Sequence, residues 1–208
     1  MPLKVKICGL SETNQVETCL KYGANMCGFI MFYPKSHRNL SIEKARELTA
    51  VKNAKSNVAV MVEPNLSDLE RIKNLNFQYY QIYGDQDPAE INEIKKRNNV
   101  KIIKALTIET GKDVLQYKKY EAVSDIILFD SIGREKSLSF DHSLLKDVPK
   151  NVIKMIAGNI QVQDLEKISK IADIVDVSGA VETEKKKDLT KIKEFLLKIK
   201  EINENRTL

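Results

Sequence analysis

The chain has 208 residues, of which 42% are hydrophobic and 30% are charged, as is ordinary for a soluble globular protein that is large enough to bury a core. Its 34 basic and 29 acidic residues give a net charge of +5, and because the excess is spread along the chain, a nucleic-acid partner is not expected. Its apolar runs are too short to span a bilayer and its N-terminus has no signal-peptide pattern, so we expect a cytoplasmic protein without membrane partners.

Short runs rich in Val and Ile alternate with amphipathic segments along the chain. The runs predict eight strands, at Leu3–Ile7, Met26–Met31, Val58–Val62, Gln78–Ile82, Lys101–Ala105, Asp125–Phe129, Val152–Ile156 and Ile174–Val177. The segments between and after them predict helices at Ser11–Tyr22, Ser41–Val51, Asn65–Asn74, Asp87–Asn98, Gly111–Tyr120, Asp141–Leu145, Val162–Lys170 and Asp188–Asn203. Strands without polar alternation, each followed by a helix, indicate a parallel sheet that is covered on both faces.

Several helix ends carry recognisable local signals. Gly23 suits the end of the first helix, Ser41 is placed to cap the second, and Pro88 falls in the first turn of the fourth. The tightest basic run, Lys185–Lys187, is interpreted as a solvated entry to the last helix.

Eight β-α units predict an α/β fold in which residues 1–208 form a single (β/α)₈ barrel domain. A doubly wound open sheet is the alternative. No G-x-G-x-x-G motif follows the first predicted strand, which argues against a dinucleotide-binding version of that alternative.

The three cysteines lie close together in the sequence, at Cys8, Cys19 and Cys27. They lack CxxC spacing and a histidine pattern, so no metal site is expected, and a reducing compartment is the simplest setting. Cys19 on a helix face and Cys27 in the second strand are interpreted as structural. Cys8, at the tip of the first strand, could either close the core or face a pocket.

In a barrel of this kind, the residues that carry chemistry gather where strands end and loops begin. Cys8, Arg38 and Asp130 fall at such positions, and small residues follow the last two strands at 157–159 and 178–180. A thiol and a carboxyl group could act as base and acid, Arg38 could bind an anionic group, and backbone N–H groups of the small residues could hold a phosphate. Each feature also has a plainer interpretation, as a turn cap, a surface arginine or a simple turn.

Several short motifs lie at or near these positions. They include Lys6-Ile7-Cys8-Gly9-Leu10, Ser36-His37-Arg38, Gln81-Ile82-Tyr83-Gly84, Leu128-Phe129-Asp130-Ser131, Ala157-Gly158, Asp176-Val177-Ser178 and Val181-Glu182. In this order, along nearly the whole chain, they resemble the motifs of the phosphoribosylanthranilate isomerase family of tryptophan biosynthesis. The resemblance implies a (β/α)₈ barrel that needs no cofactor or metal and works as a monomer or homodimer.

The resemblance also implies a reaction and a set of site residues. N-(5-phosphoribosyl)anthranilate, a phosphorylated small-molecule substrate, undergoes an Amadori rearrangement to 1-(2-carboxyphenylamino)-1-deoxyribulose 5-phosphate. Cys8 would be the general base, Asp130 the general acid, and Arg38 the partner of the anthranilate carboxylate. The remaining substrate-binding residues would be Gln81, Gly158, Asn159, Ser178, Gly179 and Ala180.

The chain departs from the family pattern at several positions. Tyr83 stands where the family usually has histidine, and Asn159 and Ala180 stand in loops that are usually richer in glycine. The usual glycine loop after the catalytic aspartate is replaced by Arg134-Glu135-Lys136-Ser137. The side chains of Arg134 and Lys136 could contact the substrate phosphate in place of that loop.

These departures keep an alternative function open. A non-catalytic or repurposed barrel of the same family could bind a phosphorylated ligand or a protein partner. A related sugar-phosphate isomerase, the aminoaldose isomerase of histidine biosynthesis, is less favoured, because an aspartate would be expected where Cys8 stands.

Overall fold

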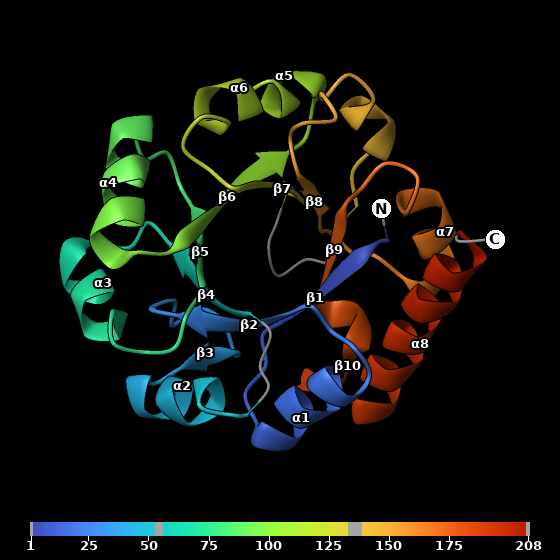
Figure 1. The fold of residues 1–208 in the computed structure, drawn as a ribbon, viewed down its shortest axis with the longest axis horizontal. Coiled ribbons are helices and arrows are strands. Elements are labelled where there is room, and N and C mark those ends of the chain that lie inside the picture. The colour runs from blue at the N-terminus through green and yellow to red at the C-terminus, as the bar shows by residue number, and fades with distance from the viewer. Residues whose placement is uncertain (1, 53–55, 133–138, 207–208) are drawn as a thin grey trace.

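A computed structural model describes residues 2–52, 56–132 and 139–206 of the chain. Eight parallel strands form a closed barrel with the helices on its outside (Figure 1). The barrel strands are β1 Lys4–Cys8, β2 Met26–Met31, β4 Asn57–Val62, β5 Tyr79–Tyr83, β6 Lys101–Ile108, β7 Ile126–Ser131, β8 Lys154–Ile156 and β9 Ile174–Val177. The barrel closes because β1 pairs with both β2 and β9. The predicted (β/α)₈ barrel is therefore confirmed.

The outer layer consists mainly of helices. The α-helices are α1 Thr13–Lys21, α2 Ile42–Thr49, α3 Leu66–Ile72, α4 Pro88–Asn98, α5 Gly111–Val114, α6 Tyr117–Tyr120, α7 Leu165–Ile168 and α8 Leu189–Asn205. Short 3₁₀ helices lie at η1 His142–Leu145, η2 Val162–Asp164 and η3 Gly179–Val181. The predicted end signals are confirmed: Ser41 accepts the N–H of Lys44, Pro88 is the first residue of α4, and Gly23 follows α1 with φ +94°.

Three short strands were not predicted. The strand β3 Asn39–Leu40 pairs with β2. The strands β10 Glu182–Thr183 and β11 Lys186–Lys187 pair with each other as a hairpin. The hairpin turn places Glu184 at φ +51° and Lys185 at φ +61°, a conformation that Asn and Gly usually supply, so the sequence carries no turn signal there. The interpretation of Lys185–Lys187 as a solvated helix entry is wrong for Lys187, whose side chain is buried against Glu182.

Side chains on the strands alternate between the barrel interior and the layer under the helices. Val5 and Ile7 of β1 belong to the outer layer, where Cys19 and Cys27 are also buried. Cys8 belongs to the interior cluster, with apolar residues such as Val60, Leu128, Met155 and Ala157. Three polar side chains, from Lys6, Gln81 and Asp176, are buried at interior positions of their strands.

Within residues 2–52, 56–132 and 139–206, no helix has the length and apolar character needed to cross a membrane.

Candidate active site

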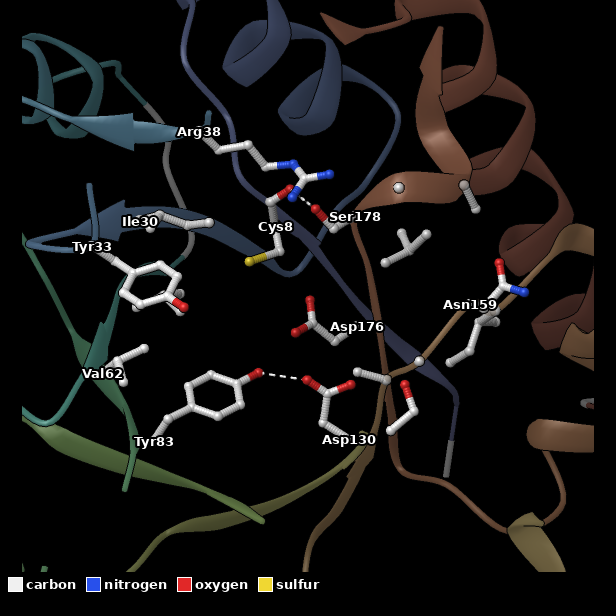
Figure 2. Close-up of a pocket in the computed structure, with 18 residues that line it drawn as sticks. Cys8, Ile30, Tyr33, Arg38, Val62, Tyr83, Asp130, Asn159, Asp176 and Ser178 are labelled. Carbon is white, nitrogen blue, oxygen red and sulfur yellow. Dashed lines mark hydrogen bonds between the residues drawn. The ribbon is translucent and has the colours of Figure 1, made fainter. Parts of the chain in front are cut away.

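A pocket opens at the carboxyl ends of the barrel strands (Figure 2). Eight of the nine residues predicted to form a site line it, namely Cys8, Arg38, Asp130, Gly158, Asn159, Ser178, Gly179 and Ala180. Gln81, the ninth, is buried at an interior position of β5 and contacts the pocket residue Tyr83. Arg134 and Lys136, considered for the phosphate, lie outside the described residues.

Cys8 is the last residue of β1, and Gly9 turns the chain away at φ +78°. The facing residue on β2 is Gly28. A Cβ atom at Gly28 would lie 3.1 Å from the Cys8 sulfur and 3.0 Å from Lys6 Cε, so a glycine here makes room for both side chains. Burial raises the pKa of the Cys8 thiol, while the positive charges of Lys6 and Lys187 act in the opposite direction.

Lys6 and Asp176 form a buried ion pair inside the barrel. The Lys6 ammonium donates to both Asp176 carboxylate oxygens, at 2.9 and 2.8 Å. Burial alone would lower the pKa of Lys6, but Asp176 and Cys8 raise it above its ordinary value. Lys6 therefore remains a cation next to the thiol, and Asp176 presents its carboxylate to the pocket.

Asp130 lies near the end of β7 and faces the pocket. The Tyr83 hydroxyl donates a hydrogen bond of 2.7 Å to Asp130 Oδ2 (Figure 2). Burial raises the pKa of Asp130 to about 6, with Asp176 adding to the rise and the bond from Tyr83 opposing it. About a tenth of the molecules would then hold a neutral Asp130 at pH 7, so this carboxyl group can act as an acid near neutrality.

Arg38 lies over the pocket close to Cys8 (Figure 2). Its guanidinium holds both oxygens of Glu182, Nε to Oε1 and Nη2 to Oε2, each at 2.7 Å. Lys187 Nζ donates to Glu182 Oε1 as well, at 2.6 Å. Partial burial would raise the pKa of Glu182, but the two cations lower it to about 2. Glu182 is thus a permanent anion that holds Arg38 extended.

The loops after β8 and β9 line one side of the pocket. Gly158 has φ +102° and Asn159 has φ +49°, a left-handed conformation that Asn tolerates better than most residues. Ala180 lies in η3 and is not among the described residues with positive φ, so alanine fits there without strain. Lys187 Nζ, on β11, links the hairpin to the loop after β9 by donating to the Ser178 carbonyl at 2.9 Å.

The pocket has two unlike sides in Figure 2. Ile30, Tyr33 and Val62 form an apolar and aromatic wall, and Asn159 lies on the opposite side. Cys8 and Asp130 lie between them. This arrangement can hold a flat apolar group at one end and an anion near backbone N–H groups at the other, with an acid and a base in the middle.

Within the part of the chain that the structure describes, no group of three or more His, Cys, Asp or Glu side chains is placed to hold a metal ion.

Five contributors were not among the predicted site residues: Lys6, Tyr83, Asp176, Glu182 and Lys187. Lys6 and Asp176 had a usable signal. Each lies two residues before a predicted site residue, Lys6 before Cys8 and Asp176 before Ser178, and strand residues two apart point to the same side. Glu182 belongs to the Val181-Glu182 motif, but its contacts with Arg38 and Lys187 depend on a hairpin that the sequence does not signal.

Known proteins resemble this chain over most of its length. Residues 5–198 match the family described as N-(5'phosphoribosyl)anthranilate (PRA) isomerase. Proteins named N-(5'-phosphoribosyl)anthranilate isomerase from Bradyrhizobium diazoefficiens and Bacillus cereus (strain B4264) are 34% and 32% identical to it. The matches cover 88% and 96% of this chain and 86% and 98% of those proteins.

Solved structures agree with the sequence matches. Phosphoribosyl anthranilate isomerase from Thermotoga maritima superposes with a TM-score of 0.86 at 26% identity, over 96% of this chain and 99% of that chain. A structure of the isomerase in complex with reduced 1-(o-carboxyphenylamino)-1-deoxyribulose 5-phosphate gives a TM-score of 0.83 at 26% identity, over the same shares. A third, of monomers generated from the dimeric Thermotoga maritima isomerase, gives 0.85 at 25% identity, again over 96% and 99%.

Proposed function

The chain belongs to the N-(5'-phosphoribosyl)anthranilate isomerase family, and we propose that Cys8 is the general base and Asp130 the general acid of its reaction. It is an isomerase of tryptophan biosynthesis that interconverts an aminoaldose and an aminoketose. The observation that carries the role assignment is the presence of a thiol and a neutralisable carboxyl group in one pocket, between an apolar wall and the loops after β8 and β9.

In the first step Asp130 protonates the furanose ring oxygen. The O–H bond at the carboxyl group breaks, an O–H bond forms on the ring oxygen, and the bond from that oxygen to C1 opens to leave a protonated Schiff base. A carboxyl group with a pKa near 6 suits this role, because an acid transfers its proton best when its pKa lies near the working pH.

In the second step the Cys8 thiolate removes the proton from C2. The electron pair of the C–H bond flows toward the iminium nitrogen and produces an enolamine. Proton gain at C1 and proton loss from the enol hydroxyl complete the aminoketose. The Lys6 ammonium supports the thiolate, because a nearby cation favours the charged form of a thiol.

The two sides of the pocket suggest how the substrate lies. The anthranilate ring would pack on Tyr33 and Ile30, with its carboxylate near the cationic guanidinium of Arg38, which Glu182 holds in place. The phosphate would accept backbone N–H groups from Gly158–Asn159 and Gly179–Ala180. The related isomerase solved with a reduced phosphorylated product analogue supports this class of ligand.

The setting is part of the proposal. We expect residues 1–208 to form one domain, without a cofactor, that works in the cytoplasm as a monomer or homodimer. The dimeric isomerase of Thermotoga maritima supports the dimer, and three buried free cysteines suit a reducing compartment.

The decisive experiment follows the fluorescence of freshly made phosphoribosylanthranilate as the enzyme consumes it. Cys8→Ala and Asp130→Asn should each lower kcat by about 10²–10⁴-fold. Cys19→Ala, at a buried cysteine away from the pocket, is the matched control and should keep its activity. Rescue of a tryptophan-requiring strain gives a parallel test. No turnover by the unaltered protein, beside an active related isomerase, would favour the non-catalytic alternative.

A further inference from the structure

A chain of two hydrogen bonds runs from the barrel interior to Asp130. Gln81 and Tyr83 are two residues apart on β5, so both side chains point inward. Gln81 Nε2 donates to the Tyr83 hydroxyl oxygen at 3.3 Å, and the same hydroxyl donates to Asp130 Oδ2 at 2.7 Å. A dashed line between Tyr83 and Asp130 marks the second bond in Figure 2.

The direction of this chain follows from its donors. An amide NH₂ group can only donate, so the Tyr83 oxygen accepts from Gln81 and its own proton is available for Asp130. Gln81 Oε1 is buried with no hydrogen-bond partner among the described residues, which leaves the NH₂ end as the part of Gln81 that the network uses. Burial and the nearby carboxylate of Asp130 raise the pKa of Tyr83 well above its ordinary value, so the hydroxyl stays a donor throughout the working range.

We propose that Tyr83 is a positioning residue that determines which oxygen of Asp130 carries the catalytic proton. Since Oδ2 accepts from Tyr83, the proton of neutral Asp130 lies on Oδ1. That proton moves from Oδ1 to the furanose ring oxygen. Tyr83 keeps its own proton, and its hydrogen bond stabilises the carboxylate that remains. The inference rests on the role of Asp130 proposed above.

The other charged groups around Asp130 do not replace this function. Asp176 on β9 raises the pKa of Asp130, Lys6 on β1 lowers it, and the backbone at Ser131 also favours the carboxylate. Cys8 on β1 contributes to the environment of Tyr83. In the described part of the chain, the only side-chain hydrogen bond found on the Asp130 carboxylate comes from Tyr83.

Tyr83→Phe removes the hydroxyl and keeps the ring that lines the pocket. Loss of a hydrogen bond to a charged group should raise the pKa of Asp130 by about one unit. A titration of the Asp130 carboxyl carbon by ¹³C NMR reads this shift without turnover. In the pH profile of kcat/KM, the inflection near pH 6 should move upward by the same amount.

A rate measured at about pH 5 shows the effect of which Asp130 oxygen carries the proton. At that pH Asp130 is mostly protonated in both proteins, so the fraction of protonated molecules hardly differs. The Phe variant should be about three- to tenfold slower at that pH, since its proton is no longer confined to Oδ1. Tyr83→His restores an N–H donor and should recover part of the loss. Tyr79→Phe removes a hydroxyl from the same strand, at the far end of β5, and should change neither reading.

The outcomes distinguish this inference from the proposal on which it rests. An unchanged Asp130 titration and an unchanged rate at pH 5 in folded Tyr83→Phe would overturn the positioning role. Should Tyr83→Phe fail to fold, Tyr83→Leu also removes the donor, and an unchanged Asp130 titration together with an unchanged rate at pH 5 in that variant would overturn the role equally. Full activity in Asp130→Asn would instead overturn the role of Asp130 itself.

Discussion

The pH dependence of kcat/KM should reveal an unusual order of ionisation in the free enzyme. The acid, Asp130, has a pKa of about 6, whereas burial raises the pKa of the base, Cys8, above its ordinary value of 9.0. Catalysis needs Asp130 neutral and Cys8 ionised, which is the opposite of the state that these values favour. Because the pKa of Cys8 is raised still further from that of Asp130, only a small fraction of the enzyme holds the productive arrangement.

This order predicts a bell with a broad flat top. Below about pH 6, Asp130 stays protonated while the thiolate fraction grows, so kcat/KM should rise about tenfold per pH unit. Between the two pKa values, each gain in thiolate is cancelled by an equal loss of neutral Asp130, so the profile should be level. Above the pKa of Cys8, kcat/KM should fall because the thiolate is already formed and the acid continues to disappear.

The assay measures the initial loss of substrate fluorescence well below KM, in buffers of constant ionic strength, with unfolding followed in parallel. The plateau should begin at about pH 6 and end only above the ordinary pKa of a thiol. A tenfold fall per unit between pH 7 and pH 8.5 would show that the higher of the two pKa values lies below about 7, and would refute a Cys8 pKa raised above its ordinary value. Because the two groups titrate in one pocket, the inflections describe the pair.

Three further variants test the contacts around the site. Arg38→Lys should raise KM about tenfold with a smaller change in kcat, since an ammonium cannot reproduce the guanidinium fork; an unchanged KM would remove Arg38 from substrate binding. Lys6→Met leaves Asp176 as an unpaired buried charge and should lower the free energy of unfolding, measured in urea, by about 3–5 kcal/mol; an unchanged free energy of unfolding would contradict a stabilising role of the pair. Gly28→Ala forces a Cβ against Cys8 and Lys6 and should cost about 1–3 kcal/mol together with activity; equal stability to the unaltered protein would contradict the packing argument.

Most of the barrel could be predicted because its strands are short runs rich in β-branched residues, separated by amphipathic segments. The eight predicted strands correspond to the eight barrel strands, with ends shifted by a few residues. The predicted helix Gly111–Tyr120 is instead two short helices, α5 and α6. The hairpin of β10 and β11 was missed because Glu184 and Lys185 adopt positive φ without a glycine or asparagine to signal it.

The site was predictable where its residues end a barrel strand or lie in the loop that follows one. Cys8 and Asp130 lie at strand ends, so topology brings them to one rim. The partner of Arg38 was not predictable, because Glu182 reaches it through the unpredicted hairpin. The bond from Tyr83 to Asp130 was not predictable either, because it depends on the side-chain reach across two strands that are not neighbours in the barrel.

The layer beneath the pocket gives the acid and the base different environments. Residues two positions apart on a strand point the same way, so Leu128 lies below Asp130 and Lys6 lies below Cys8. Leu128 is fully buried and offers nothing to solvate a carboxylate, which favours neutral Asp130. Lys6 offers an ammonium, which favours the Cys8 thiolate. Each neighbour thus shifts its group toward the productive form, and without Lys6 the same burial would move the pKa of the thiol still further from that of Asp130. The cation below the base, as much as the base itself, therefore determines how much of the enzyme is ready to react.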